Sequence, residues 1–222
     1  MKTTLSTKPG VTQCQKPSGW LGRLMARNMN GRHSKVTDWG LSHLRIEHDF
    51  TILDIGCGGG RTVSKLAAMA THGKIYGVDY SSASVAVATK TNRDWIKTGR
   101  VTICEGSVSQ LPFANTVFDL VTAVETHFWW PDLPSNFREV LRVLKPSGTF
   151  NIIAEVYKGA DSTTARLAEK YLPATGMKLL SPDEHRHLLT DSGYIDVLIK
   201  LEPAKGWIFA SGKKRSEAPD RA

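Results

Sequence analysis

A glycine-rich loop holds the residues with the clearest chemical potential. Residues 52–61 read ILDIGCGGGR, so an apolar strand runs into glycines and then into a predicted helix. Gly56 and Gly58 let the backbone approach a ligand closely, and the N-terminus of the following helix offers free N–H groups to a negative group. We therefore predict that this loop holds an anionic part of a cofactor, with Cys57 as a small loop residue rather than a nucleophile.

The spacing of the glycines restricts the choice of cofactor. The dinucleotide fingerprint is GxGxxG/A, but its third position falls on Arg61 when counted from Gly56 and on Val63 when counted from Gly58. A phosphate-binding P-loop needs Gly-Lys-Ser/Thr, which does not follow this strand. We therefore expect neither a nicotinamide cofactor nor a nucleoside triphosphate.

Alternating strands and helices must position this loop. Seven short apolar runs predict strands, at 51–55, 74–78, 101–104, 118–124, 149–156, 194–201 and 207–211. Helical patterns occur at 62–70, 82–97, 135–144, 161–171 and 182–190, with near-helical apolar spacing also in 19–44. We predict an α/β fold: a doubly wound, mostly parallel, seven-stranded Rossmann-like sheet with an antiparallel C-terminal strand pair and an N-terminal helical lid.

Five segments, in order across residues 50–156, resemble the motifs of class I S-adenosylmethionine-dependent methyltransferases. They are LDIGCGGG at 53–60, GVDYS at 77–81, LPF at 111–113, FDLV at 118–121 and RVLKPSG at 142–148. The motif sequences resemble those of the type 11-like methyltransferases, which include the small-molecule methyltransferases of ubiquinone and menaquinone biosynthesis. The resemblance implies S-adenosylmethionine as cofactor, S-adenosylhomocysteine as product, and in-line methyl transfer to a small-molecule acceptor.

The resemblance also implies which residues bind the cofactor. Asp79 is expected to accept hydrogen bonds from both ribose hydroxyls, or else to cap the next helix. Asp54 is expected to hold the methionine ammonium, directly or through water, or to order the loop as a buried acid; the two roles are compatible. Tyr80 would lie against the adenine or on the surface. The predicted cofactor-binding set is Asp54, Gly56, Cys57, Gly58, Asp79, Tyr80, Ser107, Val108 and Glu125.

One position departs from the family. Ser107 stands where these enzymes usually carry an aspartate that accepts the adenine amino group. A hydroxyl accepts that bond only as a neutral group, which implies weaker binding or a different adenine pose. Val108 is expected to pack on the adenine or in the core.

The acceptor is expected to contact residues 123–132, AVETHFWWPD, which follow the fourth strand. This segment lacks the Asn/Asp-Pro-Pro-Tyr/Phe motif with which DNA and some protein methyltransferases bind an amino nitrogen. It also lacks the Pro-Cys motif of cytosine C5 methyltransferases. Methylation of amino nitrogens in DNA and of cytosine C5 are therefore both disfavoured. Glu125 and His127 are candidates for a catalytic base or for orienting the acceptor. Phe128, Trp129 and Trp130 are candidates for an apolar wall of the acceptor pocket. In the alternative interpretation, His127 is a hydrogen-bonded histidine in a turn, and the three aromatic residues pack under the next helix. His33 is a further catalytic candidate.

The charge is concentrated at the ends of the chain. Of the net charge of +8, residues 1–35 carry +7 and residues 205–222 carry +3, which leaves −2 for residues 36–204. Nucleic acid is therefore disfavoured as the substrate. Two alternatives to a small-molecule methyltransferase remain: an RNA-modifying enzyme that uses these basic termini, and a catalytically inactive cofactor-binding protein.

Length and composition are typical of one domain, since the chain has 222 residues and is 41% hydrophobic. We predict a flexible basic N-terminus over 1–18, a methyltransferase domain over 19–212 and a flexible tail over 213–222. The domain divides into a helical lid at 19–49, a cofactor-binding core at 50–156, and C-terminal helices and antiparallel strands at 157–212.

Cysteine spacing and hydropathy complete the predictions. Three cysteines without CxxC spacing predict neither a disulfide nor a metal site, and DEHRH at 183–187 is interpreted as a solvated helix face. The chain has neither an apolar run of roughly 18 residues nor a secretory signal pattern, so we expect a cytoplasmic protein without a membrane span. The sequence does not predict the oligomeric state.

Overall fold

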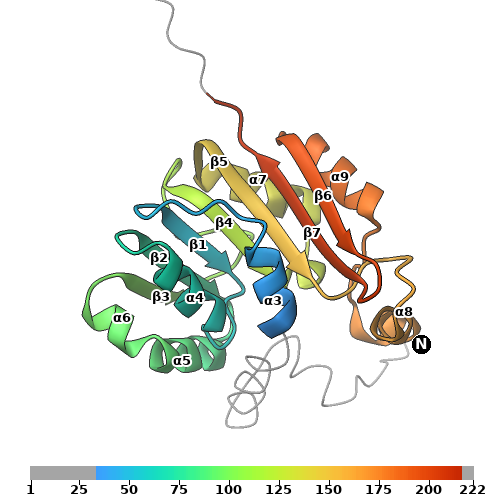
Figure 1. Ribbon diagram of the computed structural model, residues 1–222, viewed down its shortest axis with the longest axis horizontal. Coiled ribbons are helices and arrows are strands. Elements are labelled where there is room, and N and C mark those ends of the chain that lie inside the picture. The colour runs from blue at the N-terminus through green and yellow to red at the C-terminus, as the bar shows by residue number, and fades with distance from the viewer. Residues whose placement is uncertain (1–33, 217–222) are drawn as a thin grey trace, which may run out of the picture.

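A seven-stranded sheet forms the centre of the molecule in the computed structural model, which describes residues 34–216 (Figure 1). The strand order is β3-β2-β1-β4-β5-β7-β6. Strands β1 to β5 run parallel, while β7 pairs antiparallel with both β5 and β6. The predicted fold class is confirmed. The strands are β1 Thr51–Ile55, β2 Lys74–Asp79, β3 Val101–Glu105, β4 Phe118–Val124, β5 Leu144–Ala154, β6 Ile195–Glu202 and β7 Trp207–Lys213.

Helices cover both faces of this sheet (Figure 1). On one face α4 packs against β1 and β2, α5 against β2 and β3, and α3 against β5 and β7. On the other face α7 packs against β5, and α9 packs against β6 and β7. The described helices are α3 Ser34–Leu41, α4 Arg61–Met69, α5 Ser82–Thr91, α6 Arg93–Lys97, η1 His127–Trp129, α7 Leu133–Val143, α8 Thr163–Thr175 and α9 Pro182–Asp191.

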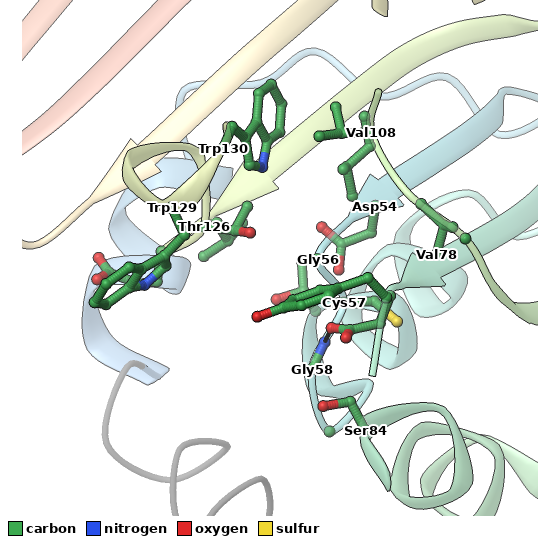
Figure 2. A pocket seen from close by; sticks show the side chains of 18 of the residues that line it. Asp54, Gly56, Cys57, Gly58, Val78, Ser84, Val108, Thr126, Trp129 and Trp130 are labelled. Carbon is green, nitrogen blue, oxygen red and sulfur yellow. Dashed lines mark hydrogen bonds between the residues drawn. The ribbon is translucent and has the colours of Figure 1, made fainter. Parts of the chain in front are cut away.

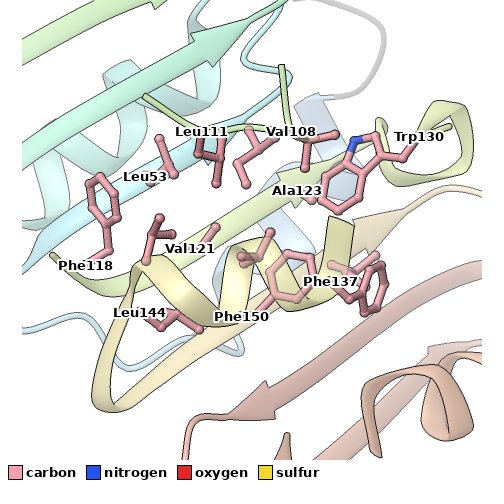
Figure 3. Packing of buried hydrophobic residues seen from close by; sticks show 14 of the residues in the cluster. Leu53, Val108, Leu111, Phe118, Val121, Ala123, Trp130, Phe137, Leu144 and Phe150 are labelled. Atoms are coloured by element: carbon pink, nitrogen blue, oxygen red, sulfur yellow. The ribbon is translucent and has the colours of Figure 1, made fainter. Parts of the chain in front are cut away.

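The apolar core lies in two layers, one on each face. The layer under α7 contains an aromatic group in which Phe137 stands edge-on to Phe150 and Trp130 stacks on Phe150 (Figure 3). Tyr194 joins this layer and donates its hydroxyl to the Phe137 carbonyl at 2.9 Å, so its one polar group is paired. The layer under α3 and α4 holds residues such as Leu66 and Ile153. Together the layers fix the carboxyl ends of the central strands.

Two element boundaries differ from the sequence predictions. The single helix predicted at 82–97 is divided into α5 and α6 at Asn92, whose side-chain amide donates to two backbone carbonyls and competes with the helix. The strand predicted at 149–156 begins at Leu144 instead, because Leu144 already pairs with Phe118 of β4 and a bulge follows before the chain returns to register at Thr149.

The described part of the predicted lid, residues 34–49, begins with helix α3, which packs closely on the sheet. A Cβ added at Gly40 would lie 2.5 Å from Ile153 side-chain atoms, so the helix backbone sits directly on β5. Lys65 of α4 pairs with Asp38 of α3. Residue 33 and those before it, including His33, lie outside the described residues, and lid closure stays a prediction. None of the helices in residues 34–216 is long and apolar enough to cross a membrane.

Candidate active site

A cavity of about 320 Å³ opens beyond the carboxyl ends of β1, β2 and β4. This is where open α/β sheets bind their ligands. All nine residues of the predicted cofactor-binding set line it, as do Trp129, Trp130 and Pro131. Figure 2 shows Trp129 and Trp130 across the cavity from Asp54 and Gly58. The cavity therefore has a glycine-loop end and an aromatic end.

The glycine loop is tied to β2 and leaves its backbone facing the cavity. The N–H groups of Gly56 and Cys57 both donate to the Val78 carbonyl, at 2.8 and 3.1 Å. Gly56 has φ of 69°, and a Cβ there would lie 2.2 Å from the Thr126 hydroxyl oxygen, so only glycine fits. At Gly58, with φ of 52°, a Cβ would meet no atom nearer than 4.0 Å, so the ligand has room to approach the backbone.

Cys57 lies in this loop with its side chain buried. Burial raises the pKa of its thiol, which the neighbouring carboxylates raise further. The thiol therefore stays protonated near neutral pH and has little nucleophilic character. This environment agrees with the interpretation of Cys57 as a small loop residue.

Asp79 joins the end of β2 to the glycine loop. Its carboxylate accepts the N–H of Gly58 through one oxygen and the N–H of Ser81 through the other, both at 2.9 Å. Burial raises the pKa of this carboxyl, while the two N–H bonds oppose that rise. The capping role considered for Asp79 belongs to Ser81, whose hydroxyl accepts the Ser84 N–H at the start of α5. Each carboxylate oxygen has a second lone pair for a ligand hydroxyl.

Asp54 is the second acid of the cavity and is 2% exposed. The Thr122 hydroxyl donates to it at 2.7 Å. Burial raises the pKa of Asp54 to about 7; the Thr122 bond opposes this rise and the nearby Asp79 adds to it. A positively charged ligand group at this end would favour the ionised form of Asp54.

The adenine-side candidates have mixed surroundings. The Ser107 hydroxyl accepts the Ser109 N–H at 3.2 Å, so it takes part in the local turn as well as lining the cavity. Val108 lines the cavity and also belongs to the core layer under α7, so it has the core-packing role, while its contact with adenine stays a prediction. Tyr80 is 41% exposed, and partial burial together with Asp79 raises its pKa to about 12. It therefore faces the cavity as a neutral phenol.

The aromatic end follows β4 through a strained residue. Glu125 has φ of 57°, its N–H donates to the Ile153 carbonyl at 2.9 Å, and its carboxylate accepts the N–H of Glu155. Glu125 is thus held against the end of β5 while lining the cavity. Trp130, only 4% exposed, stacks on Phe150 and presents a rigid surface.

His127 lies outside the cavity lining, which corrects the prediction that it meets the acceptor. The histidine is 1% exposed, and its Nε2 lies 3.0 Å from Nε2 of His185 on α9. Burial lowers the pKa of His127 well below its usual range, and His185 lowers it further. Phe128 also lies outside the lining, in a cluster with Tyr157. The predicted wall at 128–130 is therefore formed by Trp129 and Trp130.

Asn92 supports the glycine loop and was missed by the sequence analysis. Its side chain is fully buried, and its amide donates to the carbonyls of Gly60 and Ala88, both at 2.9 Å. Gly60, with φ of 78°, ends the loop and begins α4 without a side-chain cap. An asparagine in the middle of a predicted helix was the one available signal.

Comparisons with known proteins agree with this geometry. Residues 53–152 match the family described as a methyltransferase domain. An O-methyltransferase of Pyrenophora dematioidea is 29% identical over 178 residues, covering 78% of this chain and 66% of that protein. A demethylmenaquinone methyltransferase of Lactobacillus johnsonii is 26% identical over 193 residues, covering 78% of this chain and 79% of that protein. The match places a methyltransferase domain at residues 53–152 of this chain.

The methyltransferase domain shares its fold with solved structures. A SAM-dependent methyltransferase of Aquifex aeolicus has a TM-score of 0.69 at 18% identity, covering 86% of this chain and 97% of that chain. The chain spans about two thirds of the length of the P. dematioidea relative.

The residues present fit S-adenosylmethionine. The open space at Gly58 leaves room for the cofactor to approach the loop backbone, the buried acid Asp54 suits its ammonium, and Asp79 suits the ribose diol. The cavity supplies these three complements in one place.

We expect Asn92→Ala to weaken the methyltransferase domain at the glycine loop. The variant loses two side-chain bonds to carbonyls, so the free energy of unfolding should fall by about 1–3 kcal/mol. Affinity for S-adenosylhomocysteine should fall several-fold, since Gly60 loses its support. Urea unfolding and calorimetry measure the two effects. Lys90→Ala, at an exposed site of α5, is the matched control; equal behaviour of the two variants would contradict the assignment.

Proposed function

We propose that this protein transfers a methyl group from S-adenosylmethionine to a small-molecule acceptor. The observation that carries the proposal is a cavity that joins the predicted cofactor set to an aromatic wall formed by Trp129 and Trp130. Its volume of about 320 Å³ lies at the lower end of the range of small-molecule sites. The names of the P. dematioidea and L. johnsonii relatives, an O-methyltransferase and a demethylmenaquinone methyltransferase, support the same class of acceptor.

The cofactor end of the cavity orients the reactive group. When bound, S-adenosylmethionine supplies an electrophilic methyl group on a sulfonium. Asp79 holds the ribose diol with a carboxylate that Gly58 and Ser81 already fix in place. Asp54, anchored by Thr122, holds the ammonium. Because both acids are fixed within the fold, they position the methyl group with little further loss of conformational freedom.

The aromatic end receives the acceptor. Trp129 and Trp130 offer apolar surfaces that exclude water and orient a flat acceptor toward the methyl group. Glu125 is the titratable side chain of this wall among the described lining residues, and the Glu155 N–H fixes its carboxylate there. We assign Glu125 to accept a proton from an acceptor hydroxyl, or to orient an acceptor that is already ionised.

The test begins with the purified full chain and a broad panel of small acceptors. Mass spectrometry of metabolites retained by the protein selects acceptors, and methyl transfer from S-adenosylmethionine is measured for each. We expect turnover of flat apolar acceptors carrying an ionisable nucleophile. Cofactor binding without turnover across the panel would favour an inactive binding protein. Transfer to RNA with steep salt dependence would favour a nucleic-acid substrate.

Trp129→Leu should impair binding of the acceptor without impairing binding of the cofactor. We expect the KM for the acceptor to rise about tenfold, the scale of one lost aromatic contact, while the Kd of S-adenosylhomocysteine stays within about twofold. Trp95→Leu is the control, because Trp95 of α6 packs against Arg100 and does not line the cavity. Equal acceptor KM in the two variants would contradict the assignment of the wall.

A further inference from the structure

Two buried histidines link the start of the turn that carries Trp129 to α9. His127 begins η1, the turn that carries Trp129, and its Nε2 lies 3.0 Å from Nε2 of His185. We propose that His127 and His185 are positioning residues whose single hydrogen-bonded arrangement holds Trp129 and Trp130 at the acceptor end. The inference rests on the proposed function, because it assigns these histidines a part in acceptor binding.

The geometry permits one arrangement of protons in the neutral pair. Nδ1 of His185 lies 2.8 Å from the Ser181 carbonyl, and a carbonyl only accepts, so this nitrogen carries the hydrogen. The Nε2 atom of neutral His185 is then an acceptor. His127 must donate its Nε2–H across the 3.0 Å contact, which leaves its own Nδ1 bare. That Nδ1 is buried without a hydrogen-bond partner among the described residues.

This arrangement is anchored at the α9 side. Ser181 and Glu184 form a reciprocal capping box at the start of α9, so the carbonyl that fixes His185 belongs to a well-ordered turn. Leu189 of the same helix is fully buried in the core layer under α7. His185 therefore presents a fixed acceptor to His127, rather than one that moves with a loop.

A second contact ties the wall to the segment before α9. The backbone N–H of Lys178 donates to the Phe128 carbonyl at 2.9 Å, and its ammonium donates to the carbonyls of Trp130, at 3.2 Å, and Pro131. The turn is thus held by Lys178 through its backbone and by His127 through a side chain. The Lys178 contacts hold the chain path, whereas the histidine pair fixes the side of the turn that faces α9.

An additional proton would leave the hydrogen bond between the two histidines in place but would destabilise the buried turn. The bare Nδ1 of His127 is the site that can take one, and it would become a buried cation without a partner. The charged groups on the surrounding elements are Glu184 on α9, Lys158 after β5, which pairs with Glu184 at 2.9 Å, and Lys178. Glu184 and Lys158 largely offset each other, so the pair is expected to remain neutral until the solution is distinctly acidic.

The test uses the full chain and does not depend on turnover. With ¹⁵N-histidine labelling, long-range NMR spectra should show His185 as the Nδ1–H tautomer and His127 as the Nε2–H tautomer. Loss of the signals in His127→Gln and His185→Gln assigns them. Both neutral forms should persist down to about pH 6, below the ordinary histidine pKa of about 6.5. Protonation of both rings above about pH 6 would overturn the proposal.

The effect on the wall is measured through Trp129. Acrylamide quenching of its fluorescence, isolated by difference from the Trp129→Phe variant, should rise about twofold in His127→Leu and His185→Leu, which lose the hydrogen bond. The acceptor KM should rise about fivefold while the Kd of S-adenosylhomocysteine stays within about twofold. His127→Gln keeps a donor near the Nε2 position and should restore both values.

The pH dependence of quenching distinguishes a hydrogen-bonding role of His127 from a role in packing alone. Acidification should increase quenching in the native protein but not in His127→Gln, which cannot take up the proton. His187→Gln, on the exposed face of α9, is the matched control and should behave like the native protein. If His127→Leu and His185→Leu show the same quenching and acceptor KM as the native protein, the proposal fails. If the native protein does not bind S-adenosylhomocysteine, the proposed function fails instead, while the tautomers and quenching still decide this inference.

Discussion

Asp79→Ala is expected to weaken the binding of S-adenosylhomocysteine by about 1.5–3 kcal/mol, or roughly 10–150-fold. A ribose diol donates to an ionised carboxylate, and hydrogen bonds to charged groups are stronger than those between neutral groups. The variant also releases the N–H groups of Gly58 and Ser81, which loosens the glycine loop. Calorimetric titration of the ligand measures the loss.

The control must remove a negative charge without touching the cavity. Glu105 pairs with Asp79 across β2 and β3, is exposed, and does not line the cavity. Glu105→Ala should therefore leave the affinity within about twofold, since exposed charges interact weakly through water. Unchanged affinity in Asp79→Ala would reject its assignment to the ribose.

The cofactor end of the cavity was predictable because its signals are local in sequence. The strand before Gly56 and the strand that ends at Asp79 are neighbours in a parallel sheet, so their carboxyl ends meet at one edge. The order of β1 to β5 follows from alternating strands and helices, which restrict the topology strongly. The same logic places Glu125 and Trp129 after β4 at that edge.

The remaining features depend on contacts between distant segments. His185 stands 58 positions after His127, and the polar sequence around it predicted a solvated helix face. In the structure His185 is buried while Asp183, Arg186 and His187 of the same helix are exposed, so that prediction is wrong at one position. The burial arises because α9 packs against the turn after β4, a contact that no local pattern encodes.

Asp54 yields the second large prediction, a pH-dependent affinity for S-adenosylhomocysteine. If the ligand ammonium pairs with ionised Asp54, then binding below pH 7 must displace the proton held at its pKa of about 7. The Kd should then rise about tenfold per unit between pH 7 and pH 5. Calorimetry in buffers of different ionisation enthalpy should detect the release of one proton at pH 6.

The sign of this linkage differs between stability and binding. In the ligand-free protein the pKa of Asp54 is raised from 3.8 to about 7, so its contribution to stability is fully present below pH 3.8 and is lost as the pH rises through 7. A cationic ligand acts in the opposite direction, because it favours the ionised acid. Ligand-induced stabilisation in thermal unfolding should therefore grow from pH 5 to pH 7.

Asp54→Asn distinguishes the two roles considered for this acid. The amide keeps a hydrogen-bond acceptor for the Thr122 hydroxyl, which holds Asp54 at 2.7 Å, but it carries no charge. If Asp54 binds the ammonium, the variant should bind weakly at pH 7 and lose most of the pH dependence; the remainder would belong to Asp79, whose pKa is also raised by burial. If the native protein shows a flat Kd from pH 5 to pH 7, Asp54 does not pair with the ligand. Its burial beside Thr122 would then serve to order the glycine loop.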